Sequence, residues 1–151
     1  MGSILRAAGC YRAKSIRYTG ERYARAKAFS TDTKNAHLNI LVTQVSAVID
    51  PIYDKHLTKI AIELVEGATP LPLFVHPEEA LYIFGPEDGS IDQDVVDQCD
   101  HVVYIPTIGC MNLAATVNVL LYDRLAKTEK MPCDDRIIKA SRDTNNRTKI
   151  G

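Results

Sequence analysis

The sequence predicts an α/β domain with a parallel sheet and helices on both of its faces. Apolar runs of strand length, such as Lys59–Val65, Leu81–Phe84 and Val102–Ile105, alternate with segments of helical pattern. The last two runs end in tight turns containing glycine and proline, and the second turn leads into a long apolar helix from Asn112 to about Lys127. This order of elements is typical of small-molecule pockets outside the carboxyl ends of neighbouring strands.

The first half of the chain predicts short elements separated by polar turns. A helix over Ile4–Ala8 is closed by Gly9, and Pro51 disturbs the helix expected around it. In chain order we expect the helix Ile4–Ala8, a strand Ser15–Tyr18, a basic helix Glu21–Ala28, a polar loop Phe29–Ala36, a strand Leu38–Val42 and a helix Ser46–Tyr53.

The second half carries the longer apolar segments. We expect a buried strand Lys59–Val65, a proline-rich loop Gly67–Pro77, a strand Leu81–Phe84, a short helix Asp92–Cys99, a strand Val102–Ile105 and the helix from Asn112. Residues 1–130 then form one domain, and residues 131–151 form a polar tail with at most one helical turn.

Composition excludes several classes of protein. No apolar stretch is long enough to span a membrane and no secretory signal is visible, so we expect a cytoplasmic protein. The four cysteines lack a Cys-x-x-Cys pair, which argues against a zinc site or a disulfide scaffold. The four histidines are scattered, and we expect them to be solvated or loop residues, with no metal bound.

Charge is unevenly distributed along a chain of net charge −1. Residues 12–34 carry seven basic and two acidic side chains, and residues 124–151 carry eight basic and four acidic ones. Two basic ends predict a face for a polyanion such as a nucleic acid, although exposed helices are often basic merely for solubility. The residues we expect to contact a nucleic acid are Arg12, Arg17, Arg22, Arg25 and Lys27.

Common nucleotide-binding motifs do not explain the glycine-containing turns. Gly85 and Gly89 follow a strand, but neither Gly-x-Gly-x-x-Gly nor the Gly-Lys-Ser/Thr of a P-loop is present. Three other motifs occur in order: Gly-x-x-x-Arg at Gly2–Arg6, Phe-Gly-Pro-Glu-x-Gly at Phe84–Gly89, and Ile-Pro-x-x-Gly at Ile105–Gly109 followed by Cys110-Met111-Asn112-Leu113. With these motifs the chain resembles the SpoU–TrmH branch of the SPOUT superfamily of RNA methyltransferases.

The resemblance implies a fold with a C-terminal trefoil knot and an S-adenosylmethionine site inside it, without a metal. Three turns would wrap this methyl donor, and glycine and proline would let the backbone approach it closely. The positions that correspond to donor contacts are Glu63, Leu64, Gly85, Ile105, Gly109, Cys110, Asn112 and Leu113.

The resemblance also implies a reaction, methyl transfer to a ribose 2′-hydroxyl of tRNA or rRNA, with tRNA slightly favoured. Arg6 would hold the neighbouring phosphate and stabilise charge, since a guanidinium is a good clamp and a poor base. Asn112 would cap the last helix and hold Arg6 or the ribose. Glu87, the motif glutamate, has either a similar role or a purely structural one.

Some positions depart from the family pattern. Cys110 and Ala114 stand where serine is common, and the family's strand and Asn-Pro-x-Asn segment before the first motif are missing, so either the start of the gene is truncated or the sheet is completed in another way. The family's sites lie at a two-fold interface, so we expect a homodimer. The alternative class is a non-catalytic RNA-binding or assembly protein that keeps the fold.

Overall fold

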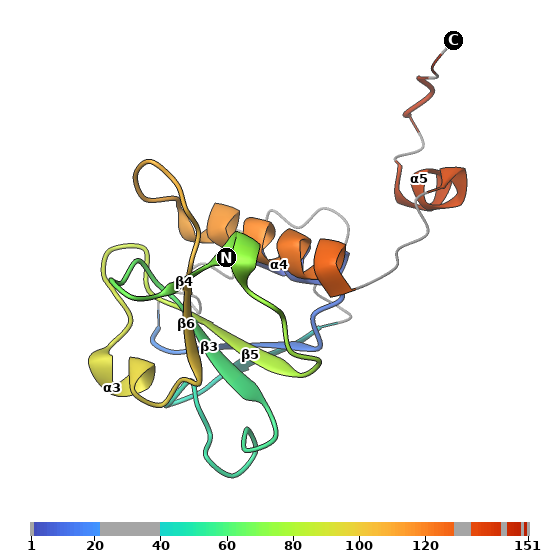
Figure 1. The fold of residues 1–151 in the computed structure, drawn as a ribbon. Helices are drawn as coiled ribbons and strands as arrows, with labels where there is room; N and C mark the ends of the chain where they lie inside the picture. Colours follow the sequence, from blue (N-terminus) through green and yellow to red (C-terminus); the bar gives the residue numbers. More distant parts are fainter. Residues whose placement is uncertain (1, 22–39, 129–133, 143–144, 149, 151) are drawn as a thin grey trace.

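The computed structural model describes residues 2–21, 40–128, 134–142, 145–148 and 150. Within them the main elements are the helices α1 (Gly2–Cys10), α3 (Gln93–Val96), α4 (Leu113–Thr128) and α5 (Asp135–Ser141). The strands are β1 (Ser15–Tyr18), β2 (Leu41–Gln44), β3 (Thr58–Ile62), β4 (Thr69–Pro70), β5 (Ala80–Phe84) and β6 (His101–Tyr104), and the 3-10 turn η3 covers Leu71–Leu73. Figure 1 shows their arrangement.

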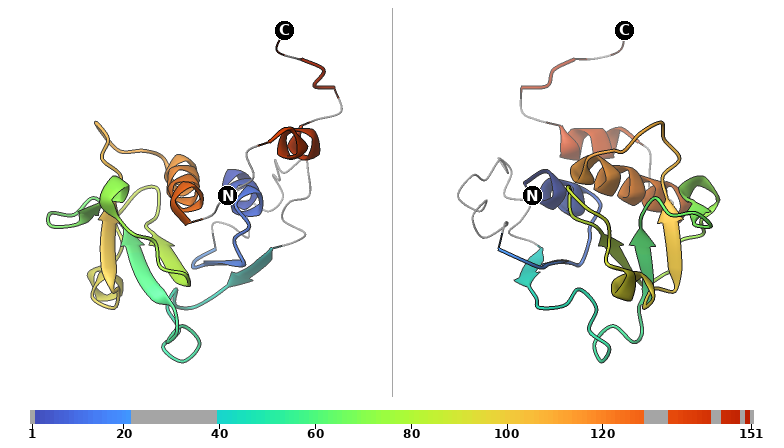
Figure 2. Two further views of the ribbon diagram at one scale, coloured as in Figure 1. Left: turned by 45° about the vertical axis from the view of Figure 1, so that its right-hand side comes forward. Right: turned by 90° about the vertical axis from the view of Figure 1, so that its left-hand side faces the viewer.

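The strands form two parallel sheets. Strands β4, β6, β3 and β5 lie side by side in that order, and β1 pairs with β2 in a separate two-stranded sheet. The predicted parallel α/β architecture is therefore confirmed, but the predicted single sheet is divided. Helix α4 covers one face of the four-stranded sheet, α1 packs beside α4, and α3 lies on the side away from α4 (Figure 2).

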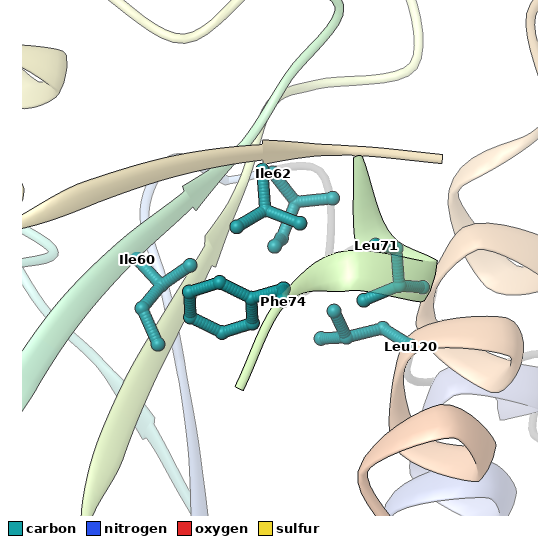
Figure 3. Close-up of a cluster of buried hydrophobic side chains, with 6 residues drawn as sticks. Ile60, Ile62, Leu71, Phe74 and Leu120 are labelled. Atoms are coloured by element: carbon teal, nitrogen blue, oxygen red, sulfur yellow. The ribbon is translucent and has the colours of Figure 1, made fainter. Parts of the chain in front are cut away.

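The core lies between α4 and the four-stranded sheet. Ile60 and Ile62 alternate with Ala61 along β3, so the two isoleucines face α4 and Ala61 is buried on the other side. Leu71 and Phe74, from the turn between β4 and β5, meet Leu120 of α4 in the same cluster (Figure 3). This packing fixes α4 against the middle of the four-stranded sheet.

Most expected elements are present with shifted ends. The helix predicted at Ile4–Ala8 runs on through Gly9 to Cys10, and the strand predicted at Leu38–Val42 lies at Leu41–Gln44. The basic helix Glu21–Ala28 and the loop Phe29–Ala36 fall almost wholly outside the described residues.

The predicted helix Ser46–Tyr53 is wrong, because this segment is a series of bends and turns. The Asp50 side chain accepts hydrogen bonds from the backbone N–H groups of Ile52 and Tyr53, at 2.9 and 3.0 Å. Together with Pro51, this local turn replaces the helical hydrogen bonds that the segment would need.

None of the described helices is both long and apolar enough to cross a membrane.

Candidate functional site

The ends of three adjacent strands meet at one edge of the main sheet. Ile62 of β3 lies opposite Phe84 of β5 on one side and opposite Val103 of β6 on the other. The segments that follow the three strands therefore leave the sheet at the same level. This alignment brings together Glu63, Leu64, Gly85 and Ile105, which the sequence places 42 residues apart at most.

Apolar side chains are exposed at this edge. Leu64 is 54% exposed, and Val65 and Ile108 are exposed as well. Exposed aliphatic groups beside backbone turns give a surface that suits the flat ring and the polar edge of a nucleoside.

The turn after β3 is tied to the turn after β5 by one carboxylate. Glu63 Oε1 accepts the Leu64 N–H at 2.9 Å, and Glu63 Oε2 accepts the Ile91 N–H at 3.0 Å. Gly85 lies against this bridge, since a Cβ there would stand 3.2 Å from Ile91 N and 3.4 Å from Glu63 Oε2. The space at Gly85 is thus occupied by the chain's own loop.

The segment between β6 and α4 is shaped by glycine and by an asparagine cap. Gly109 has a φ of +89°, which favours glycine, and nothing lies within 4 Å of a Cβ built there. Asn112 Oδ1 accepts the Ala115 N–H at 2.9 Å, so Asn112 caps α4 as the sequence predicts. Cys110 is exposed, and Leu113 opens the helix.

Helix α1 carries Arg6 in an exposed position, and the turn that ends the helix places a residue other than glycine in the left-handed conformation. The N–H groups of Arg12 and Ala13 bond back to the carbonyls of Gly9 and Ala8, which is a Schellman arrangement. Its left-handed residue is Arg12, with a φ of 56°, where glycine is the usual choice. An exposed arginine is therefore held in a conformation that disfavours it.

Arg17, one of the expected RNA contacts, has a partner inside the chain. Its Nη1 lies 2.6 Å from Oδ2 of the fully buried Asp54. Burial acts to raise the pKa of Asp54, but the hydrogen bonds from Arg17 and the Asp50 N–H outweigh it and lower that pKa. Arg17 is consequently a structural ion-pair residue as well as a candidate contact. The other expected contacts Arg22, Arg25 and Lys27 lie outside the described residues.

The sequence interpretation missed a buried polar network around His76, which was expected to be a solvated or loop residue; it does lie in a loop, but it is buried. Nε2 of His76 donates to Asp123 Oδ2 at 2.9 Å, and Nδ1 accepts from the Tyr82 hydroxyl at 2.7 Å. Arg124 Nη1 in turn donates to the Tyr82 hydroxyl at 2.9 Å, and Lys127 lies 2.7 Å from Asp123. The network joins α4 to β5 and to the loop before it.

A signal for this network was present in the sequence. Asp123, Arg124 and Lys127 follow the buried Leu120 at spacings of three, four and seven, which place them on the same face of α4. Charged side chains on the buried face of a helix call for buried polar partners.

The described residues contain no group of three or more His, Cys, Asp or Glu side chains that could hold a metal ion. The sheet edge instead offers backbone turns and exposed aliphatic groups, and α1 carries the exposed Arg6.

Solved structures of RNA-modifying enzymes have the same fold. An S-adenosylmethionine-bound rRNA methyltransferase from Sinorhizobium meliloti has a TM-score of 0.71 at 18% identity, covering 85% of this chain and 51% of its own. A TrmH/SpoU tRNA-modifying enzyme from A. aeolicus has a TM-score of 0.70 at 14% identity, covering 83% and 67%. An RNA 2′-O ribose methyltransferase has a TM-score of 0.68 at 20% identity, covering 83% and 50%.

The chain spans about half the length of several of these structures, for instance 50% and 51% of two of them. No curated protein matches the chain significantly. The model of the SpoU rRNA methylase family matches residues 1–122. Since this match covers most of the chain, the chain belongs to the SpoU rRNA methylase family.

Proposed function

We propose that this chain transfers a methyl group from S-adenosylmethionine to a ribose 2′-hydroxyl of RNA. The observation that carries the proposal is the alignment of the ends of β3, β5 and β6, which gathers the turns of the second and third motifs at one edge. Family membership supports methylation of RNA, and the 2′-hydroxyl as acceptor is the finer part of the proposal.

The residues at the edge fit the methyl donor. The adenine ring needs apolar cover, which Leu64 and Ile108 can give, and its polar edge needs backbone partners from the turns. The open space at Gly109 allows close approach of a ligand to the backbone. Glu63, Leu64, Gly85, Ile105, Gly109, Cys110, Asn112 and Leu113 remain the proposed donor site, with Glu63 and Asn112 acting through the backbone groups they hold.

When bound, the donor supplies an electrophilic methyl group on a sulfonium. Arg6 holds the phosphate next to the target ribose and so orients the 2′-oxygen for attack. Because a guanidinium is a poor base, the hydroxyl proton passes to solvent water, while the cationic side chain of Arg6 stabilises the negative charge that develops on the 2′-oxygen. Asn112 contributes by fixing the start of α4, the helix against which α1 packs.

Of the two substrates that the family motifs imply, tRNA and rRNA, we favour tRNA. The basic segment of residues 12–34 is the proposed source of the phosphate contacts. Neutralising Arg22, Arg25 and Lys27 together should weaken RNA binding and flatten its dependence on salt, since each phosphate contact releases counterions. An unchanged salt slope would mean that these three side chains only solvate the surface.

The active form is a homodimer, and the last segment of the chain is knotted. Val119 and Tyr122 of α4 are 39% and 62% exposed, on the side of the helix away from the buried Val117 and Leu120. An uncovered apolar stripe on a helix favours burial against a partner. The knot is supported by family membership.

Two measurements test the proposal. Calorimetry should detect binding of S-adenosylmethionine or its demethylated product, and labelled donor should methylate bulk RNA at a ribose 2′-oxygen that can be mapped. A chain that binds neither compound refutes the enzyme function and favours the non-catalytic RNA-binding alternative.

Replacing Arg6 separates its role from donor binding. Arg6→Ala should leave donor affinity nearly unchanged and lower methyl transfer by on the order of a hundredfold or more. Heterodimers of Arg6→Ala chains with chains that cannot bind donor should recover some activity if each site is shared between subunits. Verified heterodimers without recovery would place each site within one chain.

A further inference from the structure

We infer that Glu63 is a positioning residue that sets the shape of the donor site without touching the donor. This inference rests on the proposed function, because it assigns the turns after β3 and β5 to donor binding. Its evidence is the bridge that the Glu63 carboxylate makes between these turns.

The bridge uses both oxygens of the side chain. Oε1 accepts the N–H of Leu64, the next residue, and Oε2 accepts the N–H of Ile91, 28 residues further along the chain. A carboxylate that accepts two backbone N–H groups is satisfied by charge-assisted bonds. Glu63 is also partly buried, so its carboxylate is held between the turns.

The hydrogen bond from the Leu64 N–H fixes the orientation of the backbone at Leu64. The hydrogen bond from the Ile91 N–H fixes the far end of the loop that starts at Gly85. Both turns emerge at the same level of the sheet, since Ile62 pairs with Phe84. One side chain therefore determines the distance between two of the three proposed donor turns.

Gly85 leaves the space in which the Glu63 bridge forms. Its φ is not positive, so the position does not need glycine for its backbone conformation. Glycine is needed for space, because a Cβ would stand 3.2 Å from Ile91 N, 3.3 Å from Ser90 C and 3.4 Å from Glu63 Oε2. A side chain at position 85 would therefore push the loop away from the Glu63 carboxylate.

The first test replaces the carboxylate by an amide of the same shape. In Glu63→Gln one of the two N–H groups faces an NH₂ group, so one bond is lost. We expect hydrogen exchange at the Ile91 or Leu64 amide to accelerate, and the Kd for S-adenosylmethionine to rise by about tenfold, since one bond to a charged acceptor is removed. Exchange at core amides such as Val103 should not change. Glu78→Gln, an exposed carboxylate at the opposite end of β5, is the matched control.

The second test perturbs the bridge from the other side. Gly85→Ala should accelerate exchange at Ile91 and weaken donor binding in the same way. Gly89→Ala is its control in the same loop, because a Cβ there meets only Pro86, at 3.4 Å, and should leave exchange at Ile91 as it is in the unaltered chain.

Kinetics distinguish positioning from catalysis. At saturating donor, Glu63→Gln should keep kcat within about twofold, because the reacting groups are unchanged. The KM for the donor should rise about tenfold, because the geometry of the donor site is disturbed. Equal donor affinity and equal Ile91 exchange in the unaltered chain and Glu63→Gln would overturn the inference alone. Failure of the unaltered chain to bind donor would overturn the proposed function, and the positioning role with it.

Discussion

The buried His76 network gives a prediction about stability and pH. His76→Phe keeps a ring against Phe74, whose centroid lies 5.2 Å from that of His76, and removes both ring nitrogens. Asp123 then retains Lys127, and the Tyr82 hydroxyl retains Arg124. The replacement therefore deletes two hydrogen bonds without leaving either partner wholly unpaired.

The magnitude follows from these two bonds. A neutral hydrogen bond contributes about 1 kcal/mol, and one to a carboxylate contributes about 1.5–3 kcal/mol. His76→Phe should therefore lower the free energy of unfolding by about 2.5–4 kcal/mol at pH 8.

The same bonds set the sign of the pH effect. Burial lowers the pKa of His76, and this outweighs the opposing effect of Asp123; Arg124 and Lys127 act in the same direction as burial. Folded His76 thus stays neutral at pH values where the unfolded chain binds a proton. Its contribution is complete above the unfolded pKa of about 6.5 and is lost as the pH falls toward the folded pKa. The slope approaches about 1.4 kcal/mol per pH unit between the two values.

Urea unfolding at pH 8, 7, 6 and 5 measures both effects. The stability difference between the unaltered chain and His76→Phe should be largest at pH 8 and should shrink toward pH 5. A difference that stays constant with pH would show that His76 does not remain neutral in the fold, and the network as described would be wrong.

Three further replacements test other parts of the structure. Leu120→Ala should cost about 2–5 kcal/mol in urea unfolding, because Leu120 is fully buried, whereas Leu73→Ala, at an exposed position of η3, should change little; equal effects would contradict the packing of α4. Arg17→Met should cost about 3 kcal/mol at neutral pH, since it leaves the buried Asp54 carboxylate without its cation, and a loss under 1 kcal/mol would argue against the ion pair. Arg12→Gly should raise stability by up to about 1 kcal/mol by relieving the positive φ, and should weaken RNA binding in a filter assay; no gain in stability would mean that the position is unstrained.

Local patterns predicted the elements that the core and the motifs define. The strands at Ser15–Tyr18, β5 and β6 and the helix α4 lie close to their predicted bounds because their apolar runs coincide with turn residues and with the Asn112 cap. The motifs Gly2–Arg6, Phe84–Gly89 and Ile105–Gly109 were sufficient to indicate the family to which the chain belongs. These features depend on residues that are close together in the sequence, so they can be predicted from the sequence alone.

Contacts between distant residues were not visible in this way. Just after the Ser46–Tyr53 segment, Asp54 is fully buried because it pairs with Arg17, 37 residues earlier in the chain. His76 appears as an ordinary loop histidine until α4 brings Asp123 to within 2.9 Å of it. Likewise, Glu63 and Ile91 are 28 residues apart. The register of β3 against β5 brings the Glu63 carboxylate within hydrogen-bond distance of Ile91, in the turn after β5. Burial and long-range hydrogen bonds arise only when separate elements pack, so tertiary packing assigned the roles of these polar side chains.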